Sequence, residues 1–291
     1  MFIGNVLNFK DVEFKVKNEK ELKKILKMVY RIIGFDASNY KSSTLHRRIH
    51  KRMFETDCKT YSDYLRLLKK NHGEAQKFID TLTIKVSDFY RDKFVFDFLK
   101  RKVLPKLISN KLKKGETHIR IWSVGCAAGQ EPYSVAILFY EALGLRYYGF
   151  RVSIMGTDVD KEAIGKAKAG VYGASDVKGL SRRLREEYFV KVRRRGESTK
   201  YIVRDFLRIV KFKKHDIIEG KIPKGFDMIF CRNLLIYFTP ELQEKINKKL
   251  YKALKKDGFL VVGTSEQANY GLFKEFDKKA HVFVKKGDGS A

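Results

Sequence analysis

Cysteine, acidic side chains and long apolar runs are scarce in this chain of 291 residues, and each scarcity excludes a class of protein. No stretch approaches about eighteen consecutive apolar residues, so no membrane-spanning segment is expected. The N-terminal residues mix acids and lysines and lack an apolar run before a small-residue cleavage site, so no signal peptide is expected either. The cysteines, Cys58, Cys126 and Cys231, lie far apart. Their spacing argues against a disulfide framework and favours a reducing, cytoplasmic location.

Acids number 34 against 62 lysines and arginines, so the formal net charge is +28 at pH 7. A surface of this charge attracts polyanions such as nucleic acid, an anionic membrane or an acidic protein. Lysine enrichment is also a feature of thermophile proteomes. The charge alone does not choose between the attraction of a partner and such a background.

Several catalytic and metal-binding signatures are missing from the sequence. It has no Cys-x-x-Cys pair and no Ser-His-Asp signature. His46 and His50 stand one helical turn apart, but no acid or cysteine partner is evident and two arginines lie between them. We therefore expect a solvated basic helix there and no metal site.

The first part of the chain has the pattern of a small helical domain. Apolar residues recur at helical spacing over 22–33, 45–53, 62–73 and 74–82. These helices have basic faces, one of which includes Arg47, Arg48, Lys51 and Arg52. We place an all-α N-terminal domain over residues 1–92.

Strands and helices alternate after the polar stretch at 111–115. Strands are expected at 119–123, 152–157, 226–231, 259–263 and, as a final edge strand, 281–284. Helices are expected at 131–143, 161–168 and 240–256. This alternation predicts a doubly wound α/β domain over residues 93–291.

The segment 172–210 interrupts the alternation and is dense in lysine and arginine. A hairpin is expected between 190–192 and 201–203, on either side of a Gly-Glu-Ser turn. We interpret the segment as an inserted basic β-subdomain. The alternative is a solvated loop without a partner.

A ligand site is predicted where strands end. The loop 125–129, with a glycine at each end, joins a strand to a helix, and glycines let a backbone approach a ligand closely. It has neither the Gly-Lys-Ser/Thr of a P-loop nor the three glycines of a dinucleotide site, which favours a ligand without a pyrophosphate. Asp158 ends the next strand, where an acid binds ribose hydroxyls, although a helix cap at this place is equally normal. Arg232 and Asn233 end a later apolar strand and are expected to face the same site, unless Asn233 is a buried structural residue.

Four segments of the sequence resemble the chemotaxis receptor methyltransferase (CheR) family. They read Ser-Asp-Phe-Tyr-Arg-Asp at 87–92, Trp-Ser-Val-Gly-Cys-Ala-Ala-Gly-Gln-Glu-Pro-Tyr-Ser at 122–134, Thr-Asp-Val-Asp at 157–160 and Phe-Cys-Arg-Asn-Leu-Leu-Ile-Tyr-Phe at 230–238. Gly-Thr-Ser-Glu at 263–266 is a weaker fifth match. The matches keep the family order from about residue 20 to about residue 285. The resemblance implies a helical N-terminal domain followed by a Rossmann-like S-adenosylmethionine (SAM) methyltransferase domain with a small inserted β-subdomain.

The resemblance also implies an activity, the transfer of a methyl group from SAM to glutamate side chains of methyl-accepting chemotaxis receptors, with S-adenosylhomocysteine (SAH) as product. The implied cofactor-binding residues are Ser87, Arg91, Gly125, Gln130, Glu131, Asp158, Asp216, Ile217, Arg232 and Asn233. Arg91 and Tyr237 are the candidate catalytic residues, and a core position is the alternative for Tyr237. A glutamate acceptor is ionised at neutral pH because its pKa is about 4.3, so no general base is needed, and Arg91, Arg232 and Tyr237 are the candidates to orient it.

The expected partner is a receptor cytoplasmic domain, whose acidic helices would dock on the basic helices near Arg47. The inserted subdomain could tether a receptor C-terminal tail. We expect a monomer with no specific nucleic acid partner. A nucleic-acid methyltransferase would suit the charge, but no Asn/Asp-Pro-Pro-Tyr/Phe element follows the 226–231 strand. A catalytically weak SAM- or SAH-binding signalling module is suggested by Lys85, which replaces a usual asparagine of the family, and Gln130 replaces a usual acid.

Overall fold

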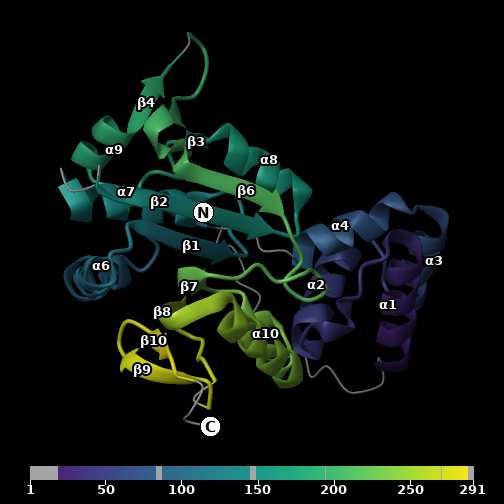
Figure 1. Cartoon of the computed structure of the whole chain (residues 1–291). Coiled ribbons are helices and arrows are strands. Elements are labelled where there is room, and N and C mark those ends of the chain that lie inside the picture. The colour runs from purple at the N-terminus through teal and green to yellow at the C-terminus, as the bar shows by residue number, and fades with distance from the viewer. Residues whose placement is uncertain (1–18, 83–86, 145–148, 194, 270, 288–291) are drawn as a thin grey trace, which may run out of the picture. The chain divides into compact units, whose positions relative to one another are not determined.

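The computed structural model describes residues 19–82, 87–144, 149–193, 195–269 and 271–287. Figure 1 traces the whole chain, which forms two compact units, Met1–Thr83 and Ile84–Ala291. Within the described residues, no helix combines the length and the apolar character that crossing a membrane requires.

The first unit is helical, as predicted. Its helices are α1 (Glu19–Ile33), the short 3-10 turn η2 (Ala37–Asn39), α2 (Ser42–Glu55), α3 (Tyr61–Lys70) and α4 (Gly73–Leu82). Leu22, Ile25 and Val29 follow one face of α1 and are buried, because residues three and four apart lie on the same side of a helix. Thr60 and Asp63 form a reciprocal capping box that starts α3.

The basic helix α2 is only partly basic on its surface. Arg47 and Lys51 are exposed. Arg52 is buried, because its guanidinium donates to both carboxylate oxygens of Glu74 at 2.7 and 2.8 Å. The expectation that Arg52 belongs to the exposed basic face is therefore wrong.

The two histidines of α2 share one partner. His46 Nδ1 and His50 Nε2 lie 2.6 and 3.0 Å from the Tyr61 hydroxyl. His46 Nε2 lies 3.5 Å from a carboxylate oxygen of Glu19. Across the described ranges, no group of three or more His, Cys, Asp or Glu side chains could hold a metal ion.

A seven-stranded sheet forms the centre of the second unit, in the order β6-β2-β1-β7-β8-β10-β9. Its strands are β1 (His118–Val124), β2 (Arg151–Asp158), β6 (Val210–Lys214), β7 (Phe226–Cys231), β8 (Leu254–Val262), β9 (Phe273–Asp277) and β10 (Val282–Lys285). β1, β2, β6, β7 and β8 pair in parallel, and β10 is antiparallel to both its neighbours. The chain leaves β1 toward β2 and returns to β7 on the other side, so the strand order reverses between β1 and β7. Ligands of α/β sheets bind at the carboxyl ends of the strands at such a point.

The C-terminal part of the sheet differs from the sequence prediction. The strand expected at the edge, 281–284, corresponds to β10, which lies between β8 and β9. The edge strand is β9, whose sequence Phe-Lys-Glu-Phe-Asp carries exposed charges and gave no strand signal.

Helices connect and flank these strands (Figure 1). They are α5 (Lys93–Phe98), the π-helical turn η3 (Leu99–Val103), α6 (Leu104–Lys113), α7 (Gln130–Leu143), α8 (Lys161–Ala169), α9 (Arg182–Tyr188), η5 (Asp205–Ile209), η6 (Leu235–Tyr237) and α10 (Pro240–Ala253). All six residues of β7 are buried. A strand covered on both faces reads as a continuous apolar run, which is why 226–231 was recognisable.

A second, three-stranded sheet has the order β3-β5-β4. Its strands are β3 (Val171–Gly173), β4 (Phe189–Val192) and β5 (Lys200–Val203), all antiparallel. The predicted hairpin is confirmed, since Val190 pairs with Ile202 and Lys191 with Tyr201. The small sheet stands beside the β6 edge of the large one, at the other end of this unit from β9 and β10 (Figure 1).

Candidate active site

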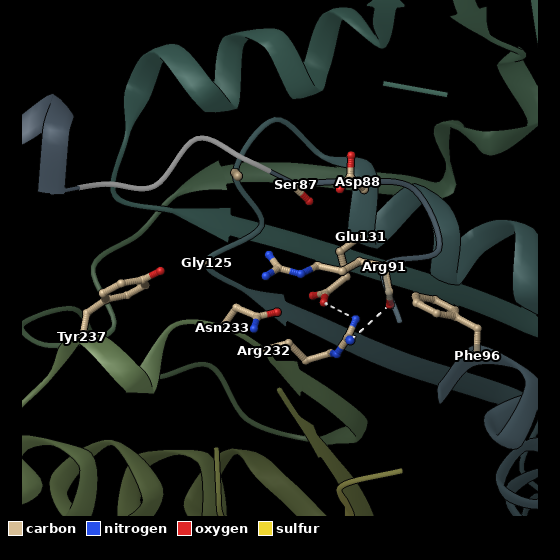
Figure 2. A pocket seen from close by; sticks show the side chains of 10 residues that line it. Ser87, Asp88, Arg91, Phe96, Gly125, Glu131, Arg232, Asn233 and Tyr237 are labelled. Atoms are coloured by element: carbon tan, nitrogen blue, oxygen red, sulfur yellow. Dashed lines mark hydrogen bonds and ion pairs between the residues drawn. The ribbon is translucent and has the colours of Figure 1, made fainter. Parts of the chain in front are cut away.

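A cavity of about 120 Å³ lies at the point where the strand order reverses, beside the carboxyl ends of β1 and β7. Figure 2 shows its lining side chains, which come from the segment before α5 and α5 itself, the loop after β1 and the first turn of α7, and the turn after β7. The lining residues are Ser87, Asp88, Arg91, Phe96, Gly125, Ala127, Glu131, Arg232, Asn233 and Tyr237. The cavity thus brings together seven of the predicted site residues and adds Asp88, Phe96 and Ala127, which were not predicted.

The glycine loop after β1 needs its second glycine for packing as well as for conformation. Gly129 has φ 93°, and a Cβ there would come within 2.9 Å of Ala167 and 3.1 Å of the Tyr172 hydroxyl. Gly125 has φ 68°, and the atoms nearest to a Cβ there belong to the side chain of Leu234, at 3.2 Å and beyond. Glycine takes such positive φ values without strain. Gly125 is therefore the glycine that faces the cavity, and Gly129 lets α7 start close to its neighbours.

Glu131 stands in the first turn of α7 and points its carboxylate at the cavity (Figure 2). The Ser123 hydroxyl donates to one of its oxygens at 2.7 Å, and the Arg232 guanidinium lies 3.6 Å from the other. Burial raises the pKa of Glu131, and the nearby Arg232 charge and the Ser123 hydroxyl oppose that rise.

Arg232 is only 6% exposed and ties three parts of the site together. Its Nη2 donates to the Asp92 carboxylate at 2.6 Å and to the Arg91 carbonyl at 3.1 Å. The guanidinium also lies over the Phe96 ring, 5.8 Å from its centre. Its buried Nε has no hydrogen-bond partner among the described residues. Much of the charge of Arg232 is thus compensated within the protein, so its main action is to hold the segment with Arg91 against the end of β7.

The segment 87–92 is also held by α7. The Tyr90 N–H donates to the hydroxyl of Ser134 at 3.0 Å, and that hydroxyl donates to the Gln130 carbonyl at 2.7 Å. Tyr90 and Asp92 both have positive φ, 53° and 58°. Such backbone positions persist only where surrounding contacts hold them. The serine of the Gly-Gln-Glu-Pro-Tyr-Ser motif therefore has a structural reason, which is to fix the segment that carries Ser87 and Arg91.

Tyr237 ends the short turn η6, is half-buried and lines the cavity. Figure 2 shows its ring entering from the opposite side of the site from Phe96. Asn233 lies between them, with a positive φ of 57°. Its backbone N–H donates to the carboxylate of Glu266 at 2.7 Å.

Four predicted residues within the described part of the chain do not line this cavity. Gln130 is 4% exposed, with its side chain buried at the start of α7. Asp158 accepts the Ala127 N–H at 2.9 Å and the Asp160 N–H at 2.9 Å. Asp216 and Ile217 follow His215, whose N–H donates to the Asp158 carbonyl at 2.9 Å. Asp158 is therefore bonded to Ala127, which lines the cavity, and Asp216 and Ile217 directly follow a residue bonded to Asp158.

Asp158 and Asp160 have separate roles in the structure. Asp160 caps α8, because its carboxylate accepts the Glu162 and Ala163 N–H groups at 2.8 and 3.1 Å. Asp158 is not the cap of this helix. Burial raises the pKa of Asp158, and the backbone N–H groups that it accepts oppose the rise. A carboxylate offers about four acceptor positions, and backbone N–H groups of Ala127, Val159 and Asp160 face Asp158, so its acceptor capacity is not exhausted.

The chemistry of these residues fits a long ligand with an amino-acid end and a ribose. The cavity alone is smaller than the roughly 300 Å³ typical of small-molecule sites, so it corresponds to one part of such a ligand. Ala127 lines the cavity with its neighbours while its N–H is held by Asp158, so the two parts adjoin. Charged groups suited to an amino acid line the cavity, and a hydroxyl acceptor stands at the end of β2. Lys85 lies outside the described residues.

Comparisons with known proteins identify the family of this chain. Residues 20–83 match the family described as "CheR methyltransferase, all-alpha domain", and residues 85–282 match "CheR methyltransferase, SAM binding domain". The chemotaxis protein methyltransferase of Borreliella burgdorferi is 33% identical over 84% of this chain and 87% of that protein. The Listeria monocytogenes protein of the same name is 33% identical over 87% and 94%, and the Escherichia coli one 27% over 87% and 86%.

The two matched regions together cover most of the chain and meet near the boundary between its two compact units. The fold, an all-α unit followed by a Rossmann-like unit, is the one predicted. The chain therefore belongs to the CheR methyltransferase family and is a SAM-dependent methyltransferase.

Proposed function

We propose that this enzyme transfers the methyl group of SAM to glutamate side chains of a chemotaxis receptor and leaves methyl esters and SAH. The observation that carries the proposal is the cavity at the strand reversal, where Arg91, Glu131 and Tyr237 meet beside the Asp158 edge. The chemotaxis protein methyltransferases among its relatives support the choice of receptor as substrate.

Bound SAM supplies an electrophilic methyl group on a sulfonium. Asp158 would accept a hydrogen bond from a ribose hydroxyl with its remaining acceptor capacity. Asp216 and Ile217 flank the adenine. Ser87 and Arg91 hold the methionine end, beside Gly125 and Glu131.

The acceptor glutamate needs positioning and no activation. Its carboxylate is ionised at neutral pH, since the ordinary pKa is about 4.3. Arg91 and Tyr237 orient this carboxylate in the cavity, and Asn233 lines the space between them. The charge of Arg232 is compensated by Asp92 and Glu131. Arg232 therefore does not form a strong ion pair that would lower the nucleophilicity of the acceptor carboxylate, and it stabilises the geometry of the site. Alignment of reacting groups is itself a large source of rate acceleration.

Basic residues of the enzyme bind acidic helices of the receptor. Arg47 and Lys51 are exposed on α2 and offer a basic face to the acidic helices of a receptor cytoplasmic domain. The segment 172–210, with its three-stranded sheet, forms an inserted subdomain that holds a receptor C-terminal tail. We propose that the enzyme works in the cytoplasm as a monomer.

The first experiment is calorimetric titration of the protein with SAH. The wild type is expected to bind, and Asp158→Asn to bind about tenfold more weakly or worse, because hydrogen bonds to a charged acceptor contribute about 1.5–3 kcal/mol each. Asp257→Asn is the matched control. It removes the same charge at an exposed position with positive φ, which asparagine tolerates.

A wild type that does not bind SAH would refute the cofactor site. Equal affinity for SAH in the wild type and Asp158→Asn would refute the ribose role of Asp158. With binding established, methyl transfer to receptor cytoplasmic fragments tests the substrate. An enzyme that binds SAH but methylates no receptor glutamate would contradict the proposed activity.

A further inference from the structure

Glu266 is a buried acid that touches two strand ends of the site at once. It is 4% exposed and follows β8. One carboxylate oxygen accepts the Asn233 N–H and the Gly263 N–H, both at 2.7 Å, and the other accepts the Ile236 N–H at 3.2 Å. Asn233 and Ile236 belong to the turn after β7, and Gly263 follows β8. The carboxylate therefore locks the turn with Arg232 and Asn233 to the neighbouring strand end.

The turn has an uncommon backbone conformation that these contacts hold in place. Asn233 has φ 57°, a left-handed conformation that asparagine adopts more readily than most residues but that only glycine takes without a Cβ penalty. Its N–H group is one of the donors that a carboxylate, as a pure acceptor, can satisfy. Without the carboxylate, these three backbone donors would lose their partner, and the turn would be free to relax toward ordinary φ values.

Gly263 makes room for the contact. A Cβ at this position would lie 2.6 Å from the Glu266 carboxylate, 2.9 Å from the Asn233 nitrogen and 3.0 Å from the Asn233 side-chain nitrogen. Any other residue would thus push the carboxylate and the turn apart. Gly263 and Glu266 act as one device, which explains why the sequence pairs a glycine with an acid three positions later.

The backbone around Glu266 is also held by hydrogen bonds. The Glu266 carbonyl lies 3.0 Å from His281 Nδ1, and the Val262 N–H donates to the His281 carbonyl at 3.1 Å. These bonds fix the loop after β8 to the residue that precedes β10. The carboxylate therefore approaches the turn from a fixed position.

We propose that Glu266 is a positioning residue for the cofactor site, which holds Asn233 and Arg232 in their binding geometry through the backbone of the turn. This role rests on the proposed function, since it assumes that the turn contacts the bound cofactor. Glu266 itself does not line the cavity, so its hydrogen bonds act on the site through the turn.

The test is Glu266→Gln, measured by SAH titration, by steady-state methyl transfer and by thermal unfolding. Glutamine keeps the shape but replaces one acceptor oxygen by an NH₂ group that faces a backbone donor. We expect the Kd for SAH to rise at least about tenfold and kcat to fall, because a misplaced turn weakens ground-state binding and alignment together.

Asp227→Asn is the matched control. Asp227 is also 4% exposed and lies near the N-terminal end of β7, away from the turn that follows this strand. Its carboxylate accepts the Arg120 N–H at 2.8 Å. Its replacement should lower the unfolding temperature as Glu266→Gln does, while the Kd for SAH stays within about twofold of wild type. If both variants lose SAH affinity in proportion to their lost stability, Glu266 is a structural residue only and the proposal is wrong.

Gly263→Ala gives an independent approach to the same turn without a change of charge. It should weaken SAH binding in the same direction, and its effect should not add to that of Glu266→Gln, because residues that act through one contact couple. Additive effects, or unchanged SAH affinity in the folded variants, would overturn the proposal while leaving the proposed function intact. A wild type that binds no SAH would instead refute the proposed function on which it rests.

Discussion

Buried carboxylates at the carboxyl end of the sheet differ in how far their charge is satisfied. Glu266 accepts three backbone N–H groups. Glu131 has one hydroxyl donor and an arginine at 3.6 Å, and its burial raises its pKa. A charge that is buried with fewer partners destabilises the folded protein, so residues shaped for a ligand reduce the stability of the ligand-free enzyme.

Glu131→Gln should therefore stabilise the ligand-free enzyme at neutral pH while it weakens SAH binding. The folded-state pKa is raised, so the native carboxylate carries its full penalty above that pKa; the penalty shrinks as the pH falls below the folded-state pKa and is gone below the unfolded-state pKa. Glutamine is neutral throughout. The gain in free energy of unfolding over wild type should be largest near pH 7 and shrink toward acidic pH. Chemical denaturation of both proteins across this range checks the prediction, and a difference that is independent of pH would contradict it.

At the residue scale, the sequence was informative wherever a residue sits directly at the end of an apolar strand. Gly125, Asp158, Arg232 and Asn233 all follow such runs, and the structure places each at the carboxyl end of its strand. Glu266 could not be recognised in this way, because its carboxylate meets an N–H 33 residues earlier in the chain. Hydrogen bonds from a side chain to a distant backbone group leave no local pattern.

At the scale of elements, helix α7 connects the glycine loop to the segment 87–92. Ser134 makes this link, as it accepts from Tyr90 and donates to the Gln130 carbonyl. Ser134→Ala should lower the free energy of unfolding by about 1–3 kcal/mol, because the Tyr90 N–H loses its partner. It should also raise the Kd for SAH severalfold, since Ser87 and Arg91 lie on the loosened segment.

A matched control for Ser134→Ala is Ser181→Ala. Ser181 caps α9 with its hydroxyl, away from the cavity lining. Loss of such a cap costs about 1 kcal/mol of stability. Denaturant unfolding and SAH titration of both variants should show lost stability in both and lost affinity in Ser134→Ala only. Unchanged SAH affinity in Ser134→Ala would show that α7 does not position the segment.

The elements that the sequence mispredicted lie in the C-terminal part of the chain. The helix expected to reach residue 256 ends at Ala253, and β8 begins at Leu254 instead of 259. The charges of Lys255, Lys256 and Asp257 look like the end of a basic helix and hide that these residues belong to β8, where its pairing with β7 is irregular. β9 was missed for the same reason, since charged residues dominate its sequence while its Phe273 is fully buried. A local sequence pattern does not indicate a strand such as β9, which is stabilised by pairing with the adjacent strand β10.

At the scale of the whole molecule, an excess of 28 positive charges must act on any acidic partner. Such fields steer association and weaken with salt, because the Debye length falls to about 8 Å at physiological ionic strength. If the net charge alone attracts the receptor, every basic surface of the enzyme contributes equally. A docking face, in contrast, depends on particular charges, and α2 offers Arg47 and Lys51 as exposed candidates.

Charge reversal separates these two cases. Arg47→Glu with Lys51→Glu should raise the KM for a receptor fragment at least about tenfold, because like charges then face the acidic helices, while the Kd for SAH stays unchanged. The double variant Lys252→Glu and Lys256→Glu changes the net charge equally at exposed positions of the other unit and should raise this KM much less. Added salt should raise the KM of the wild type steeply and that of the α2 variant only slightly. Equal losses in the two double variants would mean that the overall field attracts the receptor, and that α2 is not the docking face.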